Sequence, residues 1–119
     1  MAITSPYPAG AALGAGIFVT YSANTVVVAT SGASVNYITT APCAAGDYPD
    51  LALPGEQVWM TSSGTIGEGG LVRATTAGAA IAVTPTGAAA TWTGGIALND
   101  AANSRVLVLA QPQYHAAAS

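Results

Sequence analysis

Charged side chains are scarce in this sequence. Of its 119 residues only two are Lys or Arg and five are Asp or Glu, so 6% are charged and the formal net charge is −3. An ordinary soluble domain has about 25% charged residues. Nucleic acids and anionic membrane surfaces are bound mainly through Lys and Arg, so we expect neither as a partner. The surface is mostly neutral and available for contact with protein.

Cysteine pairs and long apolar runs are also missing. Cys43 is the single cysteine, so no internal disulfide can form, which agrees with synthesis in a reducing compartment. No apolar run reaches the roughly 18 residues of a membrane-spanning helix. No Lys or Arg precedes the first apolar residues, as it would in a secretory signal. We therefore expect a protein made in the cytoplasm, unless a leader has been removed.

Large apolar side chains are few. The chain has 27 Ala, whereas Leu, Ile, Val and Phe together number 24. Burial of each CH2 group contributes only about 0.8 kcal/mol, so an alanine-rich core gives a single copy little stability. Association with other copies or with a larger partner would compensate for this.

Residue patterns that support catalysis are incomplete. The glycine-rich run from Gly64 to Gly70 lacks the Lys and the following helix of a phosphate-binding loop, so it is read as a turn. Asp47 and Asp50 lack the alternation and the glutamate of a calcium loop. A dyad of Cys43 with His115, the only histidine, would need the two residues to meet in space. We predict no catalytic residue, no cofactor and no metal site. A small hydrolase that uses Cys43 is the alternative, and it would require His115 to reach the thiol.

What the sequence does contain is a series of short segments rich in Val, Ile, Thr and Trp, separated by Gly, Pro and Asn. This pattern predicts an all-β fold. Ser22-Ala23-Asn24 joins two such segments as a hairpin turn, with Asn24 tolerating positive φ. At most one short helical turn is expected, at 100–103 or 9–12. The predicted strands are 17–21, 25–29, 34–39, 56–61, 71–76, 79–83, 91–98 and 106–109.

The chain divides into an arm, a body and a tail. Residues 1–16 are rich in Pro and Gly and predict a flexible N-terminal arm, which is either a disordered leader or a segment that docks onto a partner. Residues 17–112 form a single β domain with a long irregular excursion at 41–54, and residues 113–119 form a C-terminal tail. The candidate docking residues of the arm are Ile3, Tyr7, Pro8 and Leu13.

Two tryptophans and two arginines are candidates for a subunit interface. Trp59 points away from the side shared by Val58 and Met60, and Trp92 lies in the 91–98 strand. Each Trp either fills the core or lies in an interface, where Trp is enriched among the residues that dominate binding. Arg73 and Arg105 are either solvated strand residues or partners of Glu56, Glu68 or Asp100 in another subunit.

Residues 54–112 resemble the capsid decoration, or cement, proteins of tailed bacteriophages. In that family a glycine, a short strand, a glycine pair and another short strand recur, followed by a late G-x-A-L strand and a closing V-x-V-x-L strand. The matching segments here are Pro54-Gly55-Glu56-Gln57-Val58, Gly64-Thr65-Ile66, Gly69-Gly70-Leu71-Val72, Thr76-Ala77-Gly78-Ala79-Ala80, Gly94-Gly95-Ile96-Ala97-Leu98 and 99–109.

The resemblance implies a small β-barrel or β-tulip-like domain that forms a homotrimer. Such a protein would bind the major capsid protein on the outside of the expanded head, near threefold positions, and stabilise the shell against DNA pressure. It implies that the 1–16 arm adds a strand to a capsid loop. The alternative is a carbohydrate- or receptor-binding domain of a phage fibre or tail, with Tyr48, Trp59 or Trp92 as a stacking platform. An exposed Trp beside carboxylates or amides would favour that alternative.

Overall fold

The computed structural model describes residues 2–32, 34–75, 77–83 and 90–115, and their regular secondary structure consists of ten strands. The all-β prediction is confirmed. The described residues contain no helix, including the two places where a helical turn was allowed. The strands are β1 (Ala2–Thr4), β2 (Phe18–Ser22), β3 (Thr25–Val28), β4 (Tyr37–Ile38), β5 (Asp50–Ala52), β6 (Gln57–Thr61), β7 (Leu71–Ala74), β8 (Ala80–Ala82), β9 (Thr91–Ala97) and β10 (Arg105–His115).

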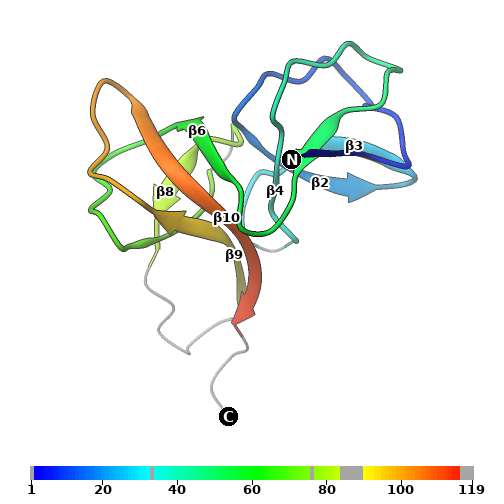
Figure 1. The fold of residues 1–119 in the computed structure, drawn as a ribbon. Coiled ribbons are helices and arrows are strands. Elements are labelled where there is room, and N and C mark those ends of the chain that lie inside the picture. Colours follow the sequence, from blue (N-terminus) through cyan, green and yellow to red (C-terminus); the bar gives the residue numbers. More distant parts are fainter. Residues whose placement is uncertain (1, 33, 76, 84–89, 116–119) are drawn as a thin grey trace.

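The largest sheet has five antiparallel strands in the order β6-β10-β9-β7-β8 (Figure 1). β10 lies between β6 and β9 and buries Val106 and Val108 completely, while Leu107 and Leu109 on its other face are half-buried. The sheet curls, and one bridge between Ser62 and Ala80 links its two edge strands. The three sheets do not close into a single barrel.

β10 is longer than predicted. It continues to His115, so residues 113–115 of the expected tail belong to the sheet, while 116–119 lie outside the described residues. Pro112 would normally end a central strand because it has no N–H to donate. Here the register shifts between Ala110 and Gln113, so Pro112 falls in a bulge where no ladder bond is required.

The N-terminal half contains a three-stranded sheet, β3-β2-β4, and a two-stranded sheet, β1-β5. Ala23 and Asn24 join β2 to β3 with φ values of 49° and 62°. Positive φ at both central residues is typical of a type I′ turn, whose twist matches that of the flanking strands. The predicted hairpin is confirmed, including the left-handed backbone at Asn24.

The N-terminal segment differs from the predicted free arm, because it is hydrogen-bonded along its length to the body. β1 pairs with β5, and the Leu13 N–H donates to the Cys43 carbonyl oxygen at 2.8 Å. Leu13 is only 4% exposed and packs with Ala9, Val19 and Val26. Leu13 is therefore a core residue and cannot serve as an exposed docking residue.

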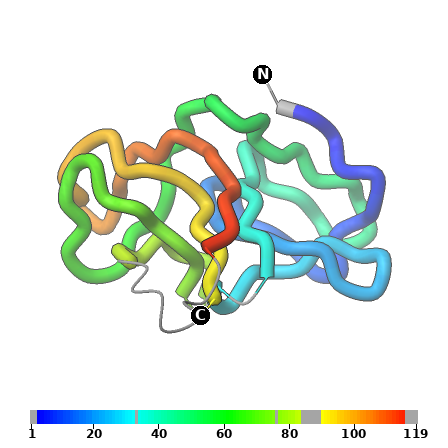
Figure 2. The backbone as a smooth tube through the Cα atoms, turned by 90° about the horizontal axis from the view of Figure 1, so that it is seen from below, coloured from blue at the N-terminus to red at the C-terminus, as the bar shows by residue number. Residues whose placement is uncertain are grey.

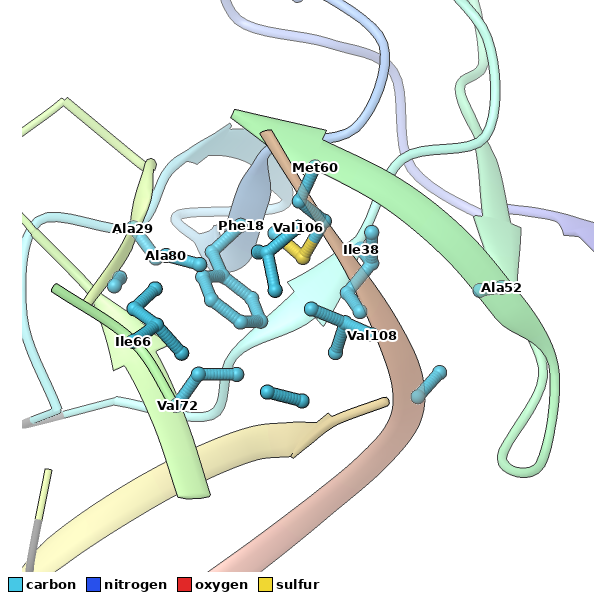
Figure 3. Close-up of a cluster of buried hydrophobic side chains, with 13 residues drawn as sticks. Phe18, Ala29, Ile38, Ala52, Met60, Ile66, Val72, Ala80, Val106 and Val108 are labelled. Atoms are coloured by element: carbon cyan, nitrogen blue, oxygen red, sulfur yellow. The ribbon is translucent and has the colours of Figure 1, made fainter. Parts of the chain in front are cut away.

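The main core lies between the two halves of the chain. The Phe18 ring of β2 and Ile38 of β4 pack against Met60, Val72 and Val106 of the five-stranded sheet (Figure 3). Most members of this cluster are Ala or Val, as the composition predicts. The complete cluster is Phe18, Ala29, Ile38, Ala52, Met60, Ile66, Val72, Ala74, Ala80, Ala97, Val106, Val108 and Ala110.

The two halves lie side by side (Figure 2), with the N-terminal segment on the outside of the N-terminal half. The radius of gyration is 13.3 Å. A single compact domain of this length is expected near 13 to 14 Å, or about 2.2 times the chain length to the power 0.38. The shared core and this size indicate one folding unit.

Candidate functional site

The four predicted interface residues fall into two pairs at opposite ends of the five-stranded sheet. Trp59 on β6 and Arg105 at the start of β10 lie at one end. Arg73 on β7 and Trp92 near the start of β9 lie toward the other end, where β9 pairs with the end of β10. These pairs have different surroundings.

Trp59 is an exposed residue. Its alternation with Val58 and Met60 was predicted correctly: Met60 is fully buried, whereas 49% of the Trp59 surface is exposed. The core interpretation of Trp59 is therefore wrong. The guanidinium carbon of Arg105 lies 5.4 Å from the centroid of the Trp59 ring, a cation–π arrangement that holds the ring in a defined orientation.

An open pocket of about 310 Å³ lies beside this pair. Its wall is completed by the loop that joins β9 to β10, drawn in orange in Figure 1. The pocket combines an aromatic ring, a guanidinium, a carboxylate and two amides. The lining residues are Trp59, Asn99, Asp100, Ala102, Asn103 and Arg105.

Hydrogen bonds hold the polar side chains of this loop. Asn99 Oδ1 accepts from the Leu107 N–H at 3.1 Å, and Asp100 Oδ1 accepts from the Glu68 N–H at 2.9 Å. Neither the amide NH2 of Asn99 nor the second carboxylate oxygen of Asp100 takes part in these two bonds.

A tight turn forms part of the pocket wall. Ala102 and Arg105 exchange two backbone hydrogen bonds of 3.0 Å each, and the residues between them, Asn103 and Ser104, have φ values of 54° and 58°. This is again the geometry of a type I′ turn. The Ser104 carbonyl accepts from the Ser62 N–H at 2.9 Å, which ties the turn to the end of β6.

Asn99 and Asn103 were not among the predicted site residues. The signal was an Asn-Asp pair directly after one strand and an Asn-Ser pair directly before the next. Asn and Asp tolerate left-handed backbone and bring polar groups to turns. Only the folded chain brings that loop next to Trp59, which is distant in sequence.

The second pair belongs to an aromatic surface at the end of the sheet. The Trp92 and Tyr114 rings are 5.2 Å apart, and Tyr114 is 52% exposed. Thr93 Oγ1 and His115 Nε2 are 3.0 Å apart on the same two strands. Arg73 and Trp92 are both half-buried and approach each other around Gly32, whose added Cβ would lie 3.1 Å from Arg73 Cδ and 3.0 Å from the Trp92 carbonyl oxygen.

The remaining arm residues lie at the surface of the N-terminal half. Ile3 on β1 is 48% exposed, and Tyr7 is 39% exposed with its ring edge on Tyr21. The Pro8 carbonyl accepts from the Val26 N–H at 2.9 Å. Tyr21 also contacts Tyr37, whose pKa is raised by burial and then by Tyr21. Ile3 and Tyr7 are thus displayed on a fixed segment.

Cys43 and His115 have separate surroundings. Partial burial raises the pKa of the Cys43 thiol, and the carboxylates of Asp47 and Asp50 raise it further, so the reactive thiolate is disfavoured. The His115 ring is hydrogen-bonded to Thr93. The geometry offers no support for the Cys43 hydrolase.

The glycine-rich loop forms a turn, as predicted. Gly64 and Gly69 have positive φ, and the Gly70 N–H donates to the Gly67 carbonyl at 3.1 Å. Among the described residues there is no group of three or more His, Cys, Asp or Glu side chains that could hold a metal ion. In the same residues no helix is long and apolar enough to cross a membrane.

No family model matches this sequence, and no curated protein matches it. A solved structure does resemble it: the crystal structure of the head fiber gp8.5 N base in bacteriophage phi29. The TM-score is 0.68 at 16% sequence identity, and the match covers 93% of this chain and 95% of that chain. This chain has the fold of a phage head fiber base.

The likeness extends over both halves of the chain, since 93% of it is matched. The three-stranded and five-stranded sheets are therefore both included in the match. At 16% identity the likeness concerns the fold.

Proposed function

We propose that this chain is a structural protein of a phage head. In this proposal it binds the outer surface of the expanded shell as a decoration (cement) protein and stabilises the shell against internal DNA pressure. The observation that carries the proposal is the fold shared with the head fiber gp8.5 N base over nearly the whole of both chains. The resemblance of residues 54–112 to capsid decoration proteins supports the same role.

The attachment site in this proposal is the outer edge of β1. β1 is one of two strands in its sheet, and its pairing partner is β5. An edge strand presents backbone N–H and C=O groups that can pair with a strand of another chain. Ile3 lies on β1 and Tyr7 follows three residues after its end, both with exposed side chains, so a strand of the major capsid protein could gain both backbone bonds and apolar contacts.

The subunit contact in this proposal is the aromatic surface formed by Arg73, Trp92 and Tyr114. Tyr114 is exposed, and Arg73 and Trp92 are half-buried. Aromatic and arginine side chains are enriched among the residues that dominate protein interfaces. A homotrimer that meets through this surface would fit a local threefold position of the shell. Its β1 edges would remain available to three capsid neighbours.

The scarcity of charge suits such a role. A neutral surface has few ions to desolvate when it is covered by protein. Each contact can be weak, because linked contacts raise the overall avidity by about a hundredfold or more when several are made at once. A structural role of this kind requires no catalytic group.

Cosedimentation with expanded heads of the encoding virus tests the proposal. Ile3→Lys places a charge on the β1 edge, and we expect about tenfold weaker binding, since lysine on an edge strand opposes strand addition. The matched control is Tyr48→Lys, because Tyr48 is 56% exposed and lies outside β1. If Ile3→Lys binds as the wild type does, β1 is not the contact. If the wild type remains in the supernatant, the proposed function is wrong.

A further inference from the structure

The pocket beside Trp59 combines an exposed Trp with a carboxylate and amides, which is the arrangement stated above to favour carbohydrate binding. This pocket has no part in head attachment as proposed above. Its wall combines one exposed aromatic ring with donors and acceptors from Asn99, Asp100, Asn103 and Arg105. We propose that this pocket binds a neutral saccharide, with Trp59 as the platform for the sugar ring.

The aromatic platform is the first part of the argument. The face of an indole ring is electron-rich, and the C–H groups on one side of a pyranose ring are weakly positive and apolar. Trp59 is 49% exposed although it lies in the middle of β6, so part of its surface is open to such a ring. Arg105 lies over the indole and also lines the pocket. It holds one face of the indole and supplies hydrogen-bond donors to the pocket.

The polar groups match the hydroxyls of a sugar. Each hydroxyl can donate one hydrogen bond and accept others, so a sugar site needs both kinds of partner. Asp100 contributes an acceptor, Arg105 contributes donors, and the amides of Asn99 and Asn103 contribute both kinds. The Oδ1 atoms of Asp100 and Asn99 are already held by backbone N–H groups, which orients the rest of each side chain.

The site is organised before any ligand binds. The Asn103-Ser104 turn is closed by two backbone hydrogen bonds and tied to β6 by a third. Ordering a loop on binding costs free energy, so a loop that is already ordered favours even a small ligand. This matters for sugars, whose individual contacts are weak.

Charge and size favour a neutral sugar of one or two rings. Asp100 and Arg105 have opposite charges, so the lining carries no formal net charge and gives a uronate or phosphate no net attraction. A volume of about 310 Å³ is at the small end of ligand pockets. It is open on one side, so a longer polysaccharide could extend out of it.

An NMR titration of the full ¹⁵N-labelled chain tests the proposal. The probes are methyl β-D-glucopyranoside, methyl β-D-galactopyranoside, N-acetylglucosamine, maltotriose and chitotriose, with glucuronate as a charged comparison. We expect a neutral probe to shift the Trp59 indole N–H and the Asn99 and Asn103 side-chain amides, with Kd on the order of 1 mM. A trisaccharide that binds much more tightly than its single sugar indicates a polysaccharide as the natural source. Equal binding indicates a free sugar.

Trp59→Ala should weaken binding about tenfold or more, whereas Tyr114→Ala should leave it unchanged. Tyr114 is the matched control because it is an aromatic residue of similar exposure outside the pocket. The proposal is overturned if no neutral probe moves these signals at its solubility limit. It is also overturned if Trp59→Ala changes the mass seen by light scattering while sugar binding persists, since Trp59 would then belong to a protein interface. Head binding by the wild type is a separate outcome, so failure of one proposal does not decide the other.

Discussion

Gly94 on β9 has no side chain, and this leaves the space in the core that the Phe18 ring occupies. A Cβ at this position would collide with the Phe18 ring, which is fully buried between the two halves of the chain. At the neighbouring Gly95 a Cβ would collide with the Leu109 carbonyl oxygen of β10. The Gly-Gly pair noticed in the sequence thus permits two close approaches at once.

Gly94→Ala should lower the free energy of unfolding by about 1 to 3 kcal/mol, because the added methyl overpacks a site that cannot move without disturbing Phe18. Urea denaturation measures this change. Gly14→Ala is the control, since no atom lies within 4 Å of an added Cβ there. We expect the control to be neutral or slightly stabilising. Equal behaviour of the two variants would contradict the described packing of Phe18.

Glu56 gives a prediction about pH. Leu53, Pro54, Gly55 and Glu56 form a turn in which Glu56 Oε1 accepts from the Leu53 N–H at 2.8 Å. This bond favours the carboxylate and lowers the pKa of Glu56 from its ordinary value of 4.5. Because the pKa is lower in the folded state, the stabilisation is present above pH 4.5 and is lost as the pH falls through the folded pKa.

Melting curves of the wild type and of Glu56→Gln at several pH values check the direction of this pH dependence. At pH 7 the wild type should melt at a higher temperature than the variant, and the difference should shrink as the pH falls below 4.5 and through the lower folded-state pKa of Glu56. A difference that is constant with pH would show that ionisation of Glu56 does not contribute.

At the scale of the elements, the N-terminal segment is part of the folded body. Leu13→Ala should cost about 2 to 5 kcal/mol, as expected for a large buried side chain reduced to alanine. Ile3→Ala, in the same segment but 48% exposed, should change stability by less than about 0.5 kcal/mol. Chemical denaturation compares them. A small effect of Leu13→Ala would indicate that the segment is not packed on the body, as the sequence suggested.

Strands that alternate in polarity were predictable, and strands that depend on distant pairing were not. β2, β3, β6, β7 and β9 were found within one or two residues of their observed ends, because their Val, Ile, Thr and Trp content and flanking glycines are local signals. β1 and β5 were missed. Their segments are rich in Pro and Gly, and their pairing of Ala2 with Ala52 joins residues far apart in the sequence.

The candidate site was predictable only in part, for a similar reason. Alternation along β6 correctly set Trp59 apart from Met60, but it could not say whether the Trp59 face would be covered. The alternation also could not predict that Asn99 and Asn103 lie next to the Trp59 ring. They do so because β6 pairs with β10, and that pairing is seen only in the folded chain. Pro112 misled the prediction of the tail, because the bulge that accommodates it has no local signal.

At the scale of the whole molecule, different surfaces have different proposed partners. The β1 edge lies on the N-terminal half, the Arg73, Trp92 and Tyr114 surface lies at one end of the five-stranded sheet, and the Trp59 pocket lies at the other. A head protein could thus be attached to the shell, contact its own copies and still present a sugar site. With so few charges, the surfaces proposed to meet protein depend on backbone pairing and apolar contact, whereas the pocket depends on an aromatic ring and hydrogen bonds.

Cryo-electron microscopy of expanded heads, with and without the added chain, tests the central claim most directly. We predict extra density on the outer surface near local threefold positions, with three copies fitting each feature and the β1 edge against the major capsid protein. Density only on a tail or fibre, or no added density at a saturating concentration of the chain, would contradict the account.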